Sequence, residues 1–261
     1  MYGYGYRYNS GLVVGAGGGA PFTNTKSLLF DGMDDEVTTS SAIVGADITL
    51  SYWVNCNSTY ASSGAYFPAS IARSDISDAN NQIGGLADRG GGSQLFVRMQ
   101  SYDENSANYS NYYCRGVQLA GTGWHNIVLT WNNSTKHLYC YIDGTVQTWS
   151  NYGNTVTTSY LNYSAYPTTV LFENNLSMGA SSPNFFGGLV DEVATFDRVV
   201  TPSEIATLST SPTVDLTDLS PYGWFRNGDG DTYPTLTDNG SGENDGTMVN
   251  MDAEDIVEIT P

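Results

Sequence analysis

Alternation of apolar and polar residues is the main pattern along the middle of this chain. Residues 48–54 read ITLSYWV, so apolar side chains take every second position while polar Thr49 and Ser51 lie between them. WHNIVLTW (124–131) repeats the pattern. A period of two places successive side chains on opposite faces of a strand, so both segments are predicted to be strands with one buried face.

Other strand-like runs follow one another with turn residues between them. They are SLLF (27–30), QLFVRMQSY (94–102), CRGVQLA (114–120), HLYCYIDGTVQTW (137–149), LSMGAS (176–181) and FFGGLVDEVATFD (185–197). NNSTK (132–136) and Asp143–Gly144 have the composition of tight hairpin turns. Many short strands with frequent turns predict an all-β fold.

One segment has the signals of a helix instead. In TPSEIATL (201–208), Thr201 is suited to the N-cap, Pro202 to the first helical position and Glu204 to a capping box. The spacing predicts a helix of about two turns, and we expect it to cover one open end of a sandwich.

Three motifs occur in order along the chain: FDGMDDEV (30–37), GWHNIVLTW (123–131) and GGLVDEVATFDRVVTPSEI (187–205). Together they resemble the concanavalin A-like, laminin-G-like jelly roll. The resemblance implies a concanavalin A-like (laminin-G-like) jelly-roll sandwich of two antiparallel sheets with one short helix, in a family that mostly binds and builds rather than catalyses. It also implies a structural role for Asp191, which we expect to be hydrogen-bonded to the loop before Pro202.

The ends of the chain differ from its centre, so the sequence divides into 1–25, 26–210 and 211–261. The first part, a Tyr/Gly-rich arm, cannot fill a core of its own. It is either a flexible leader or an adhesive arm that becomes ordered against a partner subunit. The arm residues predicted to contact a partner are Tyr2, Tyr4, Tyr6 and Tyr8.

The acidic segment 211–261 contains eleven Asp or Glu residues and one arginine. Its run GWF (223–225), followed by acidic Gly-rich residues and NDGT (244–247), resembles the first strand of laminin-G-like domains. Three arrangements are consistent with this displaced pattern. The segment completes the sandwich in cis, is donated in trans to a neighbouring copy, or packs as a separate appendage.

Charge and composition exclude several classes of partner. The chain has 261 residues and a formal net charge of −18, which argues against binding to nucleic acids or to anionic membranes. No signal peptide and no apolar run of membrane-spanning length is found. Cys56, Cys114 and Cys140 form no CxxC pair, so buried free thiols are expected, with one disulfide as the alternative.

Candidate catalytic residues are few. Retaining glycoside hydrolases need two carboxylates about 5 Å apart on opposite sides of the sugar bond. The nearest match is Glu254 and Glu258, which would share one face of a strand. His125 and His137 flank strands and are expected to be structural. The chain is therefore predicted not to be an enzyme.

Calcium is the one candidate cofactor. Acidic residues cluster in the turn at 31–36 and again at 227–231, where oxygen ligands alternate as in calcium loops. The alternative is turn chemistry, in which Asp side chains cap backbone N–H groups. The candidate calcium ligands are Asp34, Asp35, Asp229 and Asp231.

A glycan is the candidate ligand, because residues 101–114 and 151–166 combine Tyr with Asn and Ser in what we expect to be loops. The same composition suits polar surface loops or subunit contacts. The candidate glycan or partner contacts are Tyr102, Tyr109, Tyr112, Tyr113, Tyr152 and Tyr163.

The Tyr/Gly arm, the laminin-G-like centre and the C-terminal pattern also resemble virion structural proteins of marine tailed bacteriophages. This resemblance implies a non-enzymatic outer capsid, decoration or fibre-associated protein, located on the virus particle. It would form a homo-oligomer and contact other virion proteins through its arm and sandwich edges. The alternatives are a lectin-type host-recognition adhesin and, with less support, a glycoside hydrolase.

Overall fold

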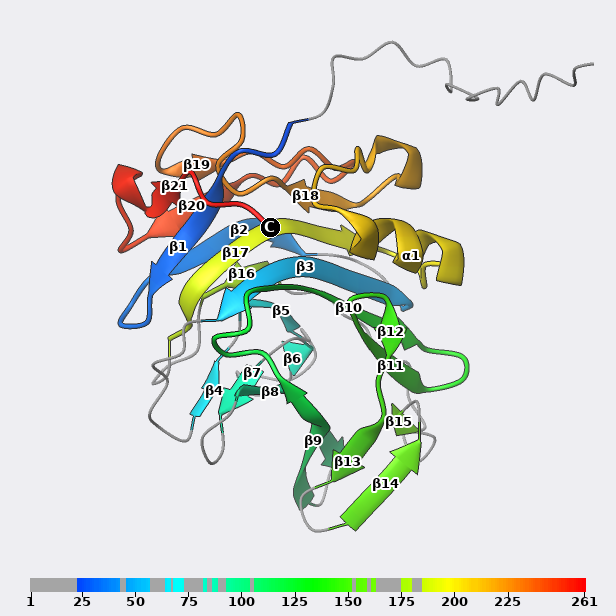
Figure 1. Ribbon diagram of the computed structural model, residues 1–261. Coiled ribbons are helices and arrows are strands. Elements are labelled where there is room, and N and C mark those ends of the chain that lie inside the picture. Colours follow the sequence, from blue (N-terminus) through cyan, green and yellow to red (C-terminus); the bar gives the residue numbers. More distant parts are fainter. Residues whose placement is uncertain are drawn as a thin grey trace, which may run out of the picture.

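The fold was obtained as a computed structural model. It describes residues 23–42, 46–56, 64–66, 68–72, 82–83, 86–88, 93–103, 106–151, 154–158, 161–162, 175–179 and 185–261. The described elements are almost all antiparallel strands, arranged in layers with one α-helix on the outside (Figure 1). The all-β jelly-roll prediction is confirmed.

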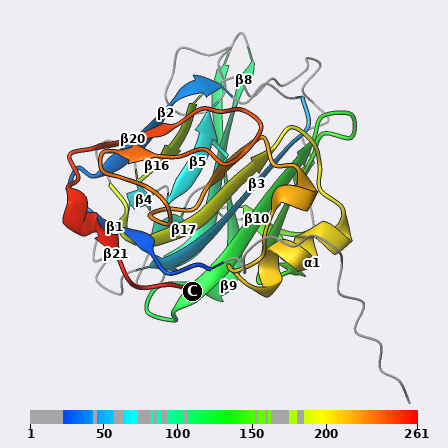
Figure 2. The same ribbon diagram turned by 90° about the horizontal axis from the view of Figure 1, so that it is seen from above.

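The first layer is a nine-stranded sheet with the order β12-β11-β10-β3-β17-β1-β21, in which β15 also pairs with β11 and β18 with β17. Figure 2 shows β17, β3 and β10 running side by side across it. The strands are β1 (Ser27–Asp31), β3 (Ile48–Cys56), β10 (Trp124–Asn132), β11 (His137–Ile142), β12 (Thr145–Val146), β15 (Leu161–Asn162), β17 (Gly187–Phe196), β18 (Gly223–Phe225) and β21 (Ile256–Val257).

The second layer contains two six-stranded sheets, with the orders β19-β20-β2-β16-β5-β6 and β14-β13-β9-β8-β7-β4, and β6 lies beside β8. The first consists of β2 (Glu36–Ala42), β5 (Ala69–Ala72), β6 (Gln82–Ile83), β16 (Asn175–Met178), β19 (Thr235–Leu236) and β20 (Gly246–Val249). The second consists of β4 (Gly64–Tyr66), β7 (Leu86–Asp88), β8 (Ser93–Asp103), β9 (Ser106–Gln118), β13 (Trp149–Asn151) and β14 (Asn154–Thr158).

The alternating segments form the strands that the sequence predicts. β10 pairs with β3 on one side and with β11 on the other, and Asp143 and Gly144 both have positive φ in the turn that follows β11. The apolar positions of β3 and β10 are buried against the second layer, in a core that includes Val37, Ile71 and Met178. The two layers therefore share one hydrophobic core.

The polar positions of β3 are buried too, because the outer face of the first sheet is also covered. Helix α1 (Pro202–Thr210) places Ile205 and Leu208 in a second cluster with Val128 and Ala194 on that face. The helix begins as predicted, with Thr201 as N-cap and a capping box to Glu204. The expectation that it covers an open end of the sandwich is wrong, because its apolar side packs on the face of the sheet.

Residues 211–261 contribute strands to both layers of the same chain. β18 pairs with β17, β21 pairs with β1 at the edge of the first sheet, and β20 pairs with β2 in the second layer. Two short 3₁₀ helices, Thr217–Leu219 and Ala253–Asp255, come before β18 and β21 respectively. Each pairing satisfies backbone groups that an edge strand would otherwise expose.

Two further observations concern the described residues. Cys56 and Cys140 are buried free thiols, as expected for small apolar side chains in strands. Within the described ranges, no helix is long and apolar enough to cross a membrane.

Candidate functional site

Among the described residues, two neighbouring buried acids, Asp191 and Glu192, lie on the central strand β17. Its pairing with β3 shifts register between Asp191 and Ala194, and Glu192 has a φ of +45°. Val190 and Val193 both belong to the inner core, so the two acids between them lie outside that core. This β-bulge therefore puts two consecutive carboxyl groups on the outer side, where regular alternation would have turned Glu192 inward.

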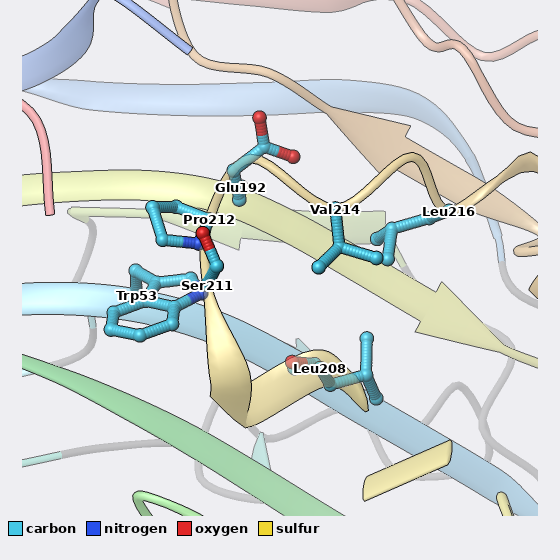
Figure 3. A pocket seen from close by; sticks show the side chains of 8 residues that line it. Trp53, Glu192, Leu208, Ser211, Pro212, Val214 and Leu216 are labelled. Carbon is cyan, nitrogen blue, oxygen red and sulfur yellow. The ribbon is translucent and has the colours of Figure 1, made fainter. Parts of the chain in front are cut away.

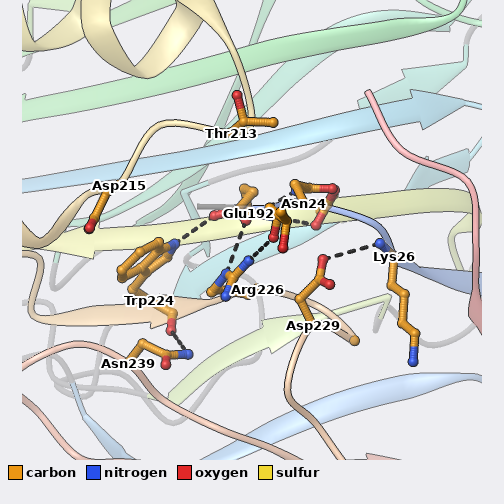
Figure 4. A network of polar contacts seen from close by, with 12 residues as sticks. Asn24, Lys26, Glu192, Thr213, Asp215, Trp224, Arg226, Asp229 and Asn239 are labelled. Atoms are coloured by element: carbon orange, nitrogen blue, oxygen red, sulfur yellow. Dashed lines mark hydrogen bonds and ion pairs between the residues drawn. The ribbon is translucent and has the colours of Figure 1, made fainter. Parts of the chain in front are cut away.

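Three segments far apart in sequence meet at this acid pair (Figure 4). The side-chain amide of Asn24 donates to Asp191 Oδ2 at 2.9 Å and to Glu192 Oε1 at 3.1 Å. The indole N–H of Trp224 donates to Glu192 Oε2 at 2.6 Å, and Arg226 Nε lies 3.6 Å from Glu192 Oε1. Asn24 precedes β1, whereas Trp224 and Arg226 belong to the C-terminal segment.

Asp229 continues the same junction on the exposed side. Its carboxylate accepts hydrogen bonds from the backbone N–H groups of Thr25 and Lys26, at 2.7 and 3.1 Å, and from the Thr25 hydroxyl. Arg226 also donates to the carbonyl oxygen of Thr23. Residues 23–26 are therefore bound to the C-terminal segment by both backbone and side-chain groups.

The environment favours the protonated form of both acids. Burial, together with the neighbouring charge of Glu192, raises the pKa of Asp191 to about 9. Burial raises the pKa of Glu192 to about 7, against the hydrogen bond from Trp224 and the charge of Arg226, which lower it. Such shifts are found at catalytic sites but also in enclosed structural networks.

The exposure of the two carboxyl groups decides between a catalytic and a structural role. Asp191 is 0 % exposed and Glu192 is 4 % exposed, and their carboxyl oxygens already bind protein donors. A sugar bond cannot enter between two groups that are closed off in this way. The acid pair therefore has a structural role: it links Asn24, which precedes β1, and the C-terminal segment to β17. Asp191 has its side-chain bond with Asn24, so the expected bond to the loop before Pro202 is wrong.

A small pocket lies on the other side of Glu192, between β3, β17 and the segment after α1 (Figure 3). Its empty space is about 210 Å³, part of it open to solvent. Figure 3 shows the Glu192 carboxylate pointing away from Leu208. The lining is mainly apolar: Trp53, Leu208, Pro212, Val214 and Leu216, with Ser51, Ser211 and the stem of Glu192.

The four candidate calcium ligands lie in two separate turns, Asp34 and Asp35 in one and Asp229 and Asp231 in the other. Among the described residues, the carboxylates of Asp31, Asp34 and Asp35 come within 4.8 Å of one another, and this group includes neither Asp229 nor Asp231. The Asp31 and Asp35 carboxylates accept backbone N–H groups of their own turn. Asp231 accepts the N–H groups of Gly228 and Thr237. These contacts are turn chemistry, and calcium binding stays a prediction.

The expectation of a loop at 101–114 is wrong, while glycan contact by its tyrosines stays a prediction. Tyr102 lies in β8, while Tyr109, Tyr112 and Tyr113 lie in β9, and the two strands pair from Asp103↔Ser106 to Gln94↔Gln118. The segment is a long antiparallel hairpin, because Tyr is a good strand former and the alternating polar residues do not prevent pairing. The remaining predicted contacts lie outside the described residues: Tyr2, Tyr4, Tyr6, Tyr8, Tyr152 and Tyr163.

The weaker catalytic candidates do not assemble a site either. Glu254 lies in a 3₁₀ helix and Glu258 follows β21, so the expectation that they share one strand face is wrong. His125 Nδ1 lies 2.8 Å from Asp143 Oδ2 and its Nε2 lies 2.9 Å from the Thr122 hydroxyl. These bonds join two turns, in agreement with the expected structural role.

Sequence reasoning missed one surface feature, an aromatic row on β11. His137, Tyr139 and Tyr141 are partly exposed and alternate with buried residues along the strand. Their rings are neighbours, with centroids 6.2 Å apart for His137 and Tyr139 and 6.4 Å apart for Tyr139 and Tyr141. The signal was present in HLYCYI, whose aromatic residues occupy every second position.

Comparisons with known proteins agree with this architecture. In solved structures, 90 % of the chain matches 60 % of a candidate carbohydrate-binding protein from Bacteroides ovatus, with a TM-score of 0.51 and 14 % identity. A heptameric SAP-like pentraxin from Limulus polyphemus matches 72 % of this chain over 82 % of its own, with a TM-score of 0.48 and 11 % identity. At these identities the likeness concerns the fold alone.

Domain 4 of the extracellular arabinanase AbnA from Geobacillus stearothermophilus, solved with arabinotriose, matches 70 % of this chain over 76 % of its own, with a TM-score of 0.47 and 16 % identity. No curated protein sequence matches the chain. The sequence profile of the concanavalin A-like lectin/glucanases superfamily matches residues 31–206, which is more than half of the chain. The chain therefore belongs to the concanavalin A-like lectin/glucanases superfamily.

Proposed function

We propose that this protein is a non-catalytic carbohydrate-binding module. The superfamily includes both lectins and glucanases, so the choice between binding and hydrolysis depends on whether two carboxylates are accessible to a sugar. The observation that carries the proposal is the enclosure of Asp191 and Glu192, which are 0 % and 4 % exposed. A hydrolase needs two carboxyl groups open to the sugar bond, whereas the described pocket is lined by a single one.

The similar fold of the Bacteroides ovatus protein supports binding as the class of function, because that protein is itself a candidate carbohydrate binder. This chain spans 60 % of its length. Because side chains fill the space between the two layers, a ligand can bind only to the outer surfaces and loops of the sandwich.

The test is a glycan array that carries neutral and sialylated glycans, combined with a reducing-sugar assay on every glycan that binds. Binding without release of reducing sugar is expected. Failure to bind any glycan would contradict the proposal. Turnover that survives purification, and that a Glu254→Gln or Glu258→Gln substitution abolishes, would show a hydrolase instead.

The location on a virus particle that the sequence predicts is compatible with a carbohydrate-binding module. A binding domain on a capsid or fibre would meet surface glycans of the host, and its arm would hold it to other copies. Immunogold imaging of purified particles with an antibody to this chain tests the location. Labelled particles would support it, and particles without label beside abundant free protein would contradict it.

A further inference from the structure

The outer face of β11 presents a continuous row of aromatic rings. His137, Tyr139 and Tyr141 are partly exposed, while the residues between them are buried in the core. The rings of Tyr139 and Tyr141 are stacked, with their planes within 26° of each other and their centroids 6.4 Å apart. The histidine ring is turned by 72° from Tyr139. The three rings therefore form a continuous aromatic strip along one strand.

The two ends of this strip differ. At one end, Tyr141 packs against the apolar cluster between α1 and the sheet, which contains Val128 and Leu208. Exposed Val146 lies opposite Tyr141 on β12. At the other end, His137 lies opposite Asn132, next to the turn of residues 133–136. The strip is therefore anchored by packing at Tyr141 and bordered by amide groups near His137.

The borders of the strip carry negative charge. Asp47 accepts the backbone N–H of Asn133 at one end, and exposed Asp143 follows β11 at the other. The nearby cation, Lys136, donates to the side-chain oxygen of Asn133 at 2.7 Å. With a net charge of −18 over the chain, this surface disfavours an anionic ligand.

We propose that the β11 aromatic row is the glycan-contact surface of the module, and that its ligand is a neutral polysaccharide lying across it. The inference rests on the proposed function. Aromatic faces stack on the apolar faces of sugars, and adjacent amides supply hydrogen bonds to hydroxyl groups. A row of rings along one strand suits a sugar chain that lies along the surface, in contrast to the small pocket beside Glu192.

The test uses affinity gel electrophoresis of the full chain in soluble β-glucan, xylan, arabinan and galactan, with polygalacturonate as the acidic comparison. Tyr139→Ala removes the central ring. Tyr139→Leu removes the ring but keeps apolar volume in the strand, so it remains informative if the alanine variant misfolds. Tyr139→Phe keeps the ring, and Tyr233→Ala removes a tyrosine that is 41 % exposed in the C-terminal segment.

The wild type is expected to be retarded by at least one neutral polysaccharide and not by polygalacturonate. The Ala and Leu variants should bind about tenfold more weakly, while the Phe variant and the Tyr233 control stay near wild type. Wild-type binding with unchanged affinity in the folded Leu variant would overturn this surface and leave the proposed function standing. Absence of wild-type binding to these polysaccharides and to the glycan array would overturn both.

A protein ligand on this surface is the remaining outcome. Sedimentation velocity of the wild type and the Leu variant separates it from glycan binding. A change of oligomeric state in the Leu variant, without any change in retardation, would show that the strip is a subunit contact and would contradict the proposal.

Discussion

The indole N–H of Trp224 donates a 2.6 Å hydrogen bond to Oε2 of Glu192, and this bond links the C-terminal segment to the central strand. Both residues are buried, at 4 % exposure each. Because β18 pairs with the same strand directly beside this bond, the backbone and side-chain contacts reinforce each other. The end of the chain is thereby part of the first sheet.

Removal of this bond should be costly. Trp224→Phe leaves a buried carboxyl oxygen without its donor, and we expect unfolding free energy to fall by about 2 kcal/mol or more. Part of that loss comes from the smaller ring, so a double-mutant cycle with Glu192→Leu, which removes the acceptor, isolates the pair by urea unfolding. A coupling energy of about 1 kcal/mol supports the bond, and additive effects would contradict it.

The raised pKa values predict how stability depends on pH. The pKa of Asp191 is about 9 in the folded protein against an ordinary 3.8, and that of Glu192 is about 7 against 4.5. Between those values the folded protein holds protons that the unfolded chain has released. The contribution of both groups is therefore complete below the ordinary values and is lost as pH rises through about 7 and 9.

Urea unfolding at pH 5, 7 and 9 measures this effect. Wild-type stability should decrease with rising pH, and Asp191→Asn should flatten the decrease because it removes the largest shift. Asp218→Asn, at an exposed position, removes the same formal charge elsewhere and should keep the wild-type slope. Equal slopes in all three proteins would show that the acid pair is not responsible.

The capping box of α1 gives a third prediction. Thr201→Ala removes the side-chain acceptor for the Glu204 N–H and should cost about 1 kcal/mol of stability. Thr207→Ala, in the same helix, removes only a bond to the helix's own carbonyl at Ser203, so it is expected to be nearly neutral. Thermal unfolding of the two variants tests the difference, and equal losses would argue against capping.

Which parts of this structure could be predicted depends on the range of the interactions. The alternation in β3, the Asp143–Gly144 turn and the Thr201 cap are local signals, and each was correctly interpreted. The surface that α1 covers was predicted wrongly, because apolar residues at Ile205 and Leu208 do not indicate which surface the helix packs against.

The candidate site depends on contacts over long distances in sequence. The Asn24–Asp191 bond joins residues 167 positions apart, and the bulge that turns Glu192 outward arises from strand pairing. Neither leaves a pattern in the sequence. The strands at 93–118 were partly interpreted as a loop because Tyr, Asn and Ser suit loops and strands alike.

Protein concentration separates completion in cis from donation in trans. If β18, β20 and β21 pair within their own chain, the Tm should be constant between about 1 and 100 μM, because no association is coupled to folding. A variant lacking residues 1–22 serves as the control, since it removes the arm as another route to association. A Tm that rises with concentration in this variant would indicate donated strands.

Deletion of residues 211–261 tests most directly whether the acidic tail is an integral part of the sandwich. The truncated protein loses β21, β20 and β18, which pair with β1, β2 and β17, and it uncovers the apolar cluster between α1 and the sheet. Gel filtration with circular dichroism should show aggregation or loss of cooperative unfolding. A truncated protein that remains monodisperse, with the Tm of the full chain, would contradict the account.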